Sequence, residues 1–344
     1  MLGSDYDYAE LLPGDASHRK YYQLCWHRND NYIGPELFCY LDPKIGSHEK
    51  FVEISKALKD IGPDIIHVNL EKGIIIQYHF ECEGASEYYY LFDAYDEESY
   101  EEYPLSRYNL KVKTRHNIFG EAVRLLDSMI RIDIPNLRRL KEDDLRSQMK
   151  TFQSLYLNGF LDMSIFEIAS QNENLEKLIN ETIANLNSQP WGNCHTDFEG
   201  RNIFGLPYWG GEHLYIIDYQ DMCIGPAGID LAGIVFDHYL CDELHSDKEA
   251  LIKELKKLTS FADKFDTNEI YKFARWGCIQ RNMRILGTLS NLYLEQDRSF
   301  RLGDLEGILT NLIRAIPDEH EDMKAFLKDQ VLPLNNRRCQ EILK

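Results

Sequence analysis

The sequence predicts an α+β protein with two lobes, a β-rich small lobe followed by a mostly helical large lobe. Short β-prone segments separated by turn signals fill the first 80 residues, and helical periodicity dominates the rest of the chain. We place the boundary near Phe80, which gives a small lobe over residues 1–80 and a large lobe over residues 81–344. A chain of 344 residues is long enough for both.

The small lobe is predicted to run strand, strand, helix, strand, strand. Residues 21–26 and 37–41 are short, apolar and β-prone, with a polar connection between them. Residues 47–60 carry apolar side chains at helical spacing and end before a Gly-Pro pair. Residues 65–70 and 73–80 then form a hairpin pattern.

The large lobe begins with a change in composition. Residues 81–108 are rich in acidic residues and tyrosine, and we interpret them as a solvated insertion; the alternative is a binding surface for a basic partner. Helical periodicity follows over residues 111–131, 142–156, 172–186, 248–261, 269–294, 304–316 and 319–328.

Composition limits the partners. A formal net charge of −19 argues against nucleic acid and anionic membranes as partners, because both require a basic footprint. The longest apolar runs, such as residues 229–236, are too short to span a membrane, and no basic, apolar leader is seen at the N-terminus. The eight cysteines lack paired metal-type spacing, which is typical of reduced thiols in a cytoplasmic protein.

Residues 194–236 contain the densest group of polar side chains that could carry chemistry. Residues 203–206 and 214–217 read as two strands with Pro and Gly residues in the turn between them. A hairpin of this length brings Asn202, at the entry of one strand, close to Asp218, at the exit of the other.

Asp197 precedes Asn202 by five residues, so a loop can fold back onto the same space. One acid can accept a proton, while an amide oxygen and a second carboxylate can hold a divalent cation. Asp197 is therefore the candidate base, and Asn202 and Asp218 are the candidate Mg²⁺ ligands. The alternative is that Asp197 caps an ordinary turn of the loop and that Asn202 and Asp218 form Asx turns at strand ends.

Asp197-x-x-x-x-Asn202, followed by a hairpin and Asp218, resembles the catalytic loop and metal-binding Asp of the protein-kinase-like fold. His195 two residues earlier, and Asp230-Leu-Ala after a Gly-Pro pair, resemble the aminoglycoside phosphotransferase and choline kinase branch. The resemblance implies ATP and Mg²⁺ as cofactors. It also implies that Asp230 accepts hydrogen bonds from the loop; alternatively, Asp230 is the N-cap of the run from Leu231. We interpret His195 as bracing the loop through a hydrogen bond, with a chemical role as the alternative.

Two further segments resemble the bacterial cell-wall sugar kinases, which phosphorylate N-acetylmuramate and N-acetylglucosamine at the anomeric hydroxyl. Residues 12–22 resemble their nucleotide loop, and residues 279–287 resemble a late helix. The resemblance implies an enzyme of peptidoglycan recycling, with Gly14, Ser17 and Arg19 at the nucleotide.

One departure from the protein-kinase pattern affects the nucleotide site. No Val-Ala-x-Lys occurs in the small lobe, so the cation at the ATP phosphates is unassigned. Arg19, Lys20 and Lys44 are the candidates, and each is also compatible with a solvated surface charge.

The acceptor, and the residues that face it, have alternative interpretations. Asp221 and Arg281 are candidates to face it, with salt bridges elsewhere as the alternative, and Arg201 has no assigned role. An aminoglycoside, choline or another amino alcohol is the alternative acceptor, and the missing lysine motivates a non-catalytic pseudokinase-like module. Cysteine catalysis through Cys194 is disfavoured, because neighbours in an extended segment point apart.

Overall fold

The computed structural model describes residues 8–12, 18–25, 33–78, 89–90, 115–206, 213–237 and 248–344. The chain divides into two compact units, which we call the sheet unit and the helical unit. The sheet unit consists of Met1–Thr114, Arg131–Asn136 and Gly200–Met222, and the helical unit consists of Arg115–Ile130, Leu137–Glu199 and Cys223–Lys344. Phe80 lies outside the described residues, and the boundary placed there stays a prediction.

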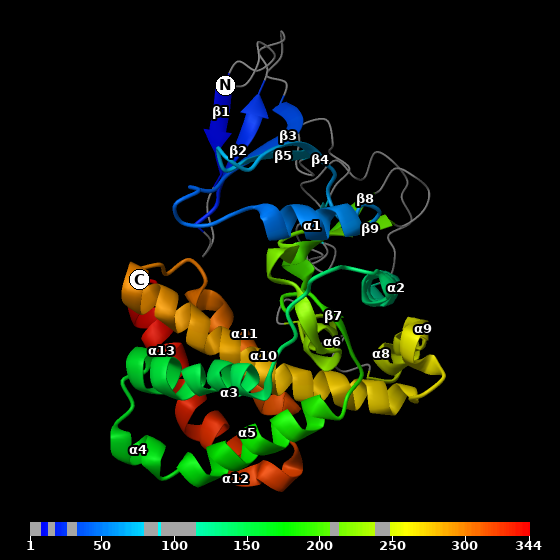
Figure 1. Cartoon of the computed structure of the whole chain (residues 1–344). Coiled ribbons are helices and arrows are strands. Elements are labelled where there is room, and N and C mark those ends of the chain that lie inside the picture. Colours follow the sequence, from blue (N-terminus) through cyan, green and yellow to red (C-terminus); the bar gives the residue numbers. More distant parts are fainter. Residues whose placement is uncertain are drawn as a thin grey trace. The chain divides into compact units, whose positions relative to one another are not determined.

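The sheet unit contains a five-stranded antiparallel sheet with the order β1-β2-β3-β5-β4 (Figure 1). Its strands are β1 (Tyr8–Leu11), β2 (Lys20–Cys25), β3 (Ile33–Tyr40), β4 (Ile65–Asn69) and β5 (Ile74–Tyr78). Helix α1 (Glu49–Ala57) buries Phe51, Val52 and Ile54. These elements confirm the predicted order of strands and helix. The prediction omitted β1, whose short Tyr-Ala-Glu-Leu sequence has no apolar run.

A second sheet in the same unit has the order β6-β8-β9 and consists of β6 (Tyr89–Tyr90), β8 (Ile203–Leu206) and β9 (His213–Ile216). Strands β8 and β9 form the predicted antiparallel hairpin, with Ile203 opposite Ile216. Strand β6 belongs to the acidic segment 81–108, and the rest of that segment lies outside the described residues.

Helix α10 (Thr267–Gln296) runs through the middle of the helical unit (Figure 1). Residues 277–287 of this helix are buried on all sides except at Arg284, which is half-buried. Helix α6 (Gly228–Val235) packs so closely against α10 that a Cβ on Gly277 would lie 1.8 Å from the carbonyl oxygen of Gly228. Glycine is therefore required at this crossing.

Further elements of the helical unit pack against this helix: α3 (Glu142–Thr151), the π-helix η4 (Phe152–Phe160), α5 (Asn172–Asn187), α8 (Lys248–Glu254) and α11 (Leu305–Ala315). Other helices of the chain are α2 (Arg115–Arg131), α4 (Ile165–Ala169), α9 (Thr259–Ala262), α12 (Glu321–Phe326) and α13 (Leu332–Ile342). Strands β7 (Trp191–Cys194) and β10 (Cys223–Pro226) pair antiparallel. Within the described ranges, no helix combines the length and the apolar character that crossing a membrane requires.

Three predicted helices differ from the structure. The helix over 142–156 continues as a π-helix to Phe160, and the chain after 319–328 continues into α13. The helix over 248–261 is broken, because Leu258 leaves the helical conformation with φ −78° and ψ 75°. Propensity alone does not show such local breaks.

Candidate active site

The loop after β7, residues 195–199, carries the predicted base and lies within the helical unit. Strand β7 is held by its pairing with β10, where Cys194 lies opposite Cys223. A Cβ on Gly233 of α6 would lie 1.9 Å from the carbonyl oxygen of Phe198, so the loop rests directly on this helix. The framework thus fixes the start and the middle of the loop.

Asp230 fixes the first turn of this loop. Its Oδ2 accepts a hydrogen bond from the backbone N–H of His195 (2.6 Å), and its Oδ1 accepts one from Thr196 (2.9 Å). Asp230 is only 1% exposed, and this burial raises the pKa of its carboxyl group, although the charge of His195 and the backbone N–H groups act in the opposite direction. Asp230 therefore makes the contacts that the resemblance implied.

Asp230 is not the N-cap that was the alternative interpretation. Helix α6 begins at Gly228 with Ala227 as N-cap, so Asp230 lies in the first turn of the helix. The start of the helix predicted from the apolar run was wrong, because Gly228 and Ile229 already adopt helical conformation.

His195 is 1% exposed, and its ring packs edge-on against Phe198 with 6.2 Å between the ring centroids. The next residue, Thr196, has a φ of 74°, a backbone conformation that β-branched residues rarely adopt. His195 thus braces the loop through its backbone N–H and its packing.

Asp197 forms an ion pair with Arg284 of α10. Nη2 of Arg284 donates to Oδ1 of Asp197 (2.6 Å) and to the carbonyl oxygen of Thr196 (2.9 Å). Burial alone would raise the pKa of Asp197, but Arg284 and Arg281 outweigh it and hold this pKa well below its usual range. Asp197 is thus an ionised carboxylate in a fixed orientation.

Glu199 and Arg281 form a second ion pair, in the interior, with side chains 6% and 1% exposed. In a buried pair of this kind each charge compensates the other. Removal of either partner would leave an uncompensated charge in the interior. The salt bridge foreseen as the alternative for Arg281 is therefore present, and a contact between Arg281 and an acceptor stays a prediction.

Cys194 next to His195 has no sign of an activated thiolate. Its hydrogen bond with Cys223 and its burial raise its pKa well above the usual value, so the group stays a neutral thiol.

Asn202 and Asp218 come together at the base of the β8–β9 hairpin in the sheet unit. The backbone N–H of Ile217 donates to the carbonyl oxygen of Asn202 (3.0 Å), which places Asp218 one residue from this contact. Asp218 is exposed and left-handed (φ 60°, ψ 34°), and its Oδ1 accepts a hydrogen bond from Nε2 of Gln220 (2.6 Å). The hairpin therefore brings the backbone of Asn202 close to that of Asp218, and their joint role as Mg²⁺ ligands stays a prediction.

Arg19 is half-buried in the same unit. Its guanidinium lies 5.9 Å from the centroid of the Phe51 ring, and this ring stacks on Tyr219 with 4.8 Å between the centroids. Burial chiefly raises the pKa of Tyr21; the charge of Asp218 adds to this shift and that of Arg19 opposes it. Arg19 and Asp218 therefore act on one local environment.

Lys20 and Lys44, the other candidates for the phosphate cation, are exposed, and so is Asp221. Gly14 and Ser17 lie outside the described residues, in the connection between β1 and β2. Arg201 is half-buried in the short helix Gly200–Asn202.

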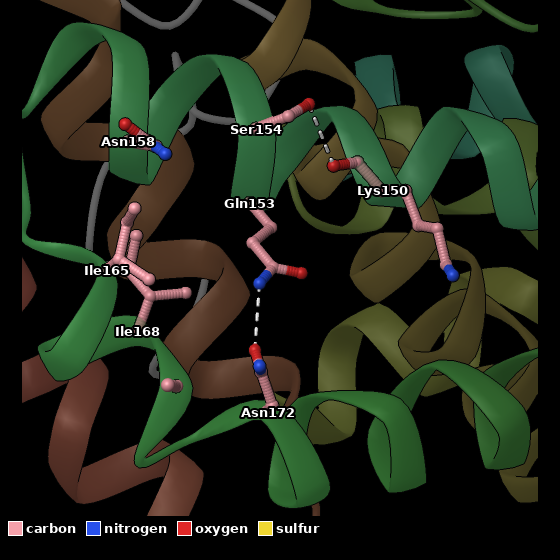
Figure 2. A pocket seen from close by; sticks show the side chains of 8 residues that line it. Lys150, Gln153, Ser154, Asn158, Ile165, Ile168 and Asn172 are labelled. Atoms are coloured by element: carbon pink, nitrogen blue, oxygen red, sulfur yellow. Dashed lines mark hydrogen bonds between the residues drawn. The ribbon is translucent and has the colours of Figure 1, made fainter.

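A pocket of about 320 Å³ opens among η4, α4 and α5 (Figure 2). Two hydrogen bonds join groups that line it: Nε2 of Gln153 donates to Oδ1 of Asn172 (2.8 Å), and Oγ of Ser154 donates to the carbonyl oxygen of Lys150 (3.2 Å). None of the predicted site residues lines it. The loop therefore remains the candidate site of the helical unit.

Sequence reasoning missed Arg284 and Glu199. Arg284 lies three residues after Arg281 in the segment 279–287, so a second arginine one turn away in an apolar helix was the available signal. Glu199 lies between Asp197 and Asn202, and nothing in its spacing distinguishes it from a surface residue.

Comparison with known proteins gives a family and a fold. A sequence model of the phosphotransferase enzyme family matches residues 43–254, more than half of the chain. No curated protein sequence matches the chain.

Among solved structures, the choline kinase of Streptococcus pneumoniae has a TM-score of 0.56 at 13% identity, covering 90% of this chain and 95% of the other. The ethanolamine kinase of Plasmodium vivax has a TM-score of 0.59 at 13% identity, with coverage of 93% and 85%. A spectinomycin phosphotransferase, solved with ADP and spectinomycin, has a TM-score of 0.56 at 15% identity, with coverage of 92% and 95%. These similarities confirm the predicted two-lobed, kinase-like fold.

Proposed function

The chain belongs to the phosphotransferase enzyme family and is a small-molecule kinase of the aminoglycoside phosphotransferase and choline kinase type; we propose that it transfers the γ-phosphoryl group of ATP to a sugar hydroxyl. The observation that carries phosphoryl transfer is the carboxylate of Asp197, which Arg284 holds ionised and oriented. Its side chain is 39% exposed, so it is accessible to an acceptor.

Asp197 orients the acceptor hydroxyl and receives its proton. The acceptor oxygen forms a bond to the γ-phosphorus while the bond from this phosphorus to the β–γ bridging oxygen breaks. The electron pair of the broken bond leaves with ADP. His195 and Asp230 support this step by fixing the backbone that carries Asp197.

The donor chemistry of Asn202 and Asp218 fits Mg²⁺, which prefers amide and carboxylate oxygens. Asp218 is exposed, and its left-handed backbone turns the chain at the end of the hairpin. When bound there, Mg²⁺ would neutralise charge on the β- and γ-phosphates.

For the phosphates themselves we propose Gly14 and Ser17, through backbone and hydroxyl groups, together with Arg19. Of the three candidate cations only Arg19 is half-buried, and Lys20 and Lys44 are exposed. A guanidinium against the Phe51 ring is held in place more firmly than a solvated ammonium group.

The proposed acceptor is N-acetylmuramate or N-acetylglucosamine at the anomeric hydroxyl, in peptidoglycan recycling and in the cytoplasm. The likeness of residues 12–22 and 279–287 to the cell-wall sugar kinases supports it. We propose Asp221, which is exposed, as a contact to the acceptor; Arg281 is buried in its pair with Glu199, so its proposed part is to hold Glu199 in place rather than to touch the acceptor.

A second candidate acceptor is a cationic amino alcohol or aminoglycoside. It is supported by the net charge of −19 and by the choline, ethanolamine and spectinomycin that name the similar structures. A nucleotide-binding module without catalysis is the remaining alternative.

The test is turnover of ATP with Mg²⁺ against N-acetylmuramate, N-acetylglucosamine, choline, ethanolamine and spectinomycin. We expect phosphorylation of an amino sugar, reduced at least about 10²-fold in Asp197→Ala. Turnover of only a cationic acceptor would replace the acceptor and keep the mechanism. ATP binding without turnover of any acceptor would favour the non-catalytic module.

A further inference from the structure

Two arginines one turn apart on α10 have different environments. Arg281 is 1% exposed and pairs with the buried Glu199, whereas Arg284 is 18% exposed and pairs with Asp197, which is 39% exposed. The Arg281–Glu199 pair is therefore buried in the interior, whereas the Arg284–Asp197 pair is accessible to a ligand.

One nitrogen of Arg284 bonds to two parts of the loop at once. Nη2 donates to Oδ1 of Asp197 and to the carbonyl oxygen of Thr196, the residue just before it. This contact links the carboxylate to the peptide that carries it. Asp230 holds the N–H groups of His195 and Thr196 from the other side, so the loop is fixed at both ends of the Thr196 residue.

In this cluster of charged groups, Arg284 is the arginine that pairs with Asp197. Glu199 neutralises Arg281 in its buried pair, although the charge of Arg281 still acts on Asp197. Burial opposes a charge on Arg284, but Asp197, followed by Glu199, raises its pKa, so the guanidinium stays protonated.

We propose that Arg284 is a positioning residue, which orients the Asp197 carboxylate towards the acceptor hydroxyl and keeps it ionised during phosphoryl transfer. This inference rests on the proposed function. A carboxylate paired with a guanidinium is a weak base, so its main contribution is to align the hydroxyl before the proton moves. Such a base is sufficient, because a loose phosphoryl-transfer transition state leaves the acceptor proton in place until late.

The test compares Arg284→Met and Arg284→Lys with a matched control, Arg275→Met. Arg275 is also a half-buried arginine of α10, and it donates to the carbonyl oxygens of Ala315 (2.7 Å) and Ile316 (3.0 Å), away from the loop. We expect Arg284→Met to lower kcat about 10²-fold with KM for ATP unchanged. Arg284→Lys should recover about tenfold of this loss, because an ammonium group restores the charge but not the planar geometry. Arg275→Met should lower thermal stability without changing kcat of the folded enzyme.

A second readout does not depend on turnover. In protein labelled with ¹³C at the aspartate carboxyls, with Asp197→Asn for assignment, the Asp197 resonance is followed as the pH falls. The charged groups that act on it are Arg284 and Arg281 from α10 and His195 from its own loop. We expect Asp197 of the native protein to stay ionised below pH values at which it titrates in Arg284→Met.

Each outcome decides one point. Unchanged kcat in Arg284→Met, or an unchanged titration of Asp197, would overturn the role of Arg284. A parallel loss of kcat in Arg284→Met and Arg275→Met would indicate a structural role only. Absence of turnover in the native protein would instead refute the proposed function, and the NMR titration would still report on the Arg284–Asp197 contact.

Discussion

The loop 195–199 of the helical unit and the hairpin base of the sheet unit hold their polar groups in different ways. In the loop, Asp230 accepts hydrogen bonds from two backbone N–H groups. Two ion pairs add to this, Arg284 with Asp197 and Arg281 with Glu199. At the hairpin base, Asp218 is exposed and its Oδ1 accepts from Gln220 on the same turn.

This difference separates two kinds of preorganisation. The loop is held by contacts between residues that are far apart in the sequence. It therefore adopts its conformation only when the helical unit is folded. The hairpin base receives its geometry from local backbone pairing, and its carboxylate is accessible to a cation. Removing the ion pair or the anchor of the loop should therefore change both stability and activity, whereas removing the carboxylate at the hairpin base should change activity far more than stability.

The largest effect is expected at the hairpin. Asp218→Ala removes a carboxylate proposed to hold Mg²⁺, so turnover should fall on the order of 10³-fold or more. Its free energy of unfolding should fall by only about 1 kcal/mol, because alanine adopts the left-handed backbone less readily than aspartate and the hydrogen bond from Gln220 is lost. Steady-state kinetics with varied Mg²⁺ and urea unfolding measure both, with Asp60→Ala as a control at another exposed acid of this unit. Full Mg²⁺-dependent turnover in Asp218→Ala would refute the assignment.

Asp230→Ala tests the opposite region. It leaves the N–H groups of His195 and Thr196 without their acceptor, which should lower the free energy of unfolding by about 3 kcal/mol. Turnover should fall as well, because the loop loses its anchor. Urea unfolding measures the loss, and Asp230→Asn, which retains one acceptor oxygen, should lose less. Equal stability of Asp230→Ala and the native protein would show that the loop does not depend on this anchor.

A pH profile sharpens the comparison within the loop. The pKa of Asp197 is lowered in the fold, so its ion pair stabilises the protein above the unfolded-state pKa, and this stability is lost as the pH falls through the folded-state pKa. The acid limb of kcat should therefore move upward by about one pH unit or more in Arg284→Met. If both proteins share one acid limb, a group other than Asp197 sets it.

The smallest effect is expected at Thr196, where φ is 74°. Glycine adopts this conformation without strain, so Thr196→Gly should raise the free energy of unfolding by about 1 kcal/mol, less any gain in unfolded-state entropy. Denaturant unfolding measures the change, and kcat should stay close to the native value because Asp230 and Arg284 still hold the loop. A clear loss of stability would show that the threonine side chain makes a compensating contact.

The features predicted correctly from the sequence are those that local patterns determine. The β8–β9 hairpin follows from two short apolar segments around a Pro- and Gly-containing turn, and it brings Asn202 and Asp218 together. Strand β1 escaped prediction because four residues with alternating polarity have little signal of their own.

The ion pairs of the loop could not be derived in this way. Arg284 and Asp197 are 87 residues apart, and helical periodicity places Arg281 and Arg284 on neighbouring positions without showing which acid each one meets. Only the packing of α10 against the loop decides that Arg281 is buried and that Arg284 is partly exposed.

The two close approaches of α6 also constrain how this sequence can vary. At Gly277 and at Gly233 a single added carbon would meet a backbone carbonyl oxygen at less than 2 Å, one in α6 and the other in the loop. In a library of random variants selected for activity, these two codons should therefore be almost invariant, although neither residue carries any chemistry. Activity should therefore tolerate substitution at these two glycines as little as at Asp197 and Asp218.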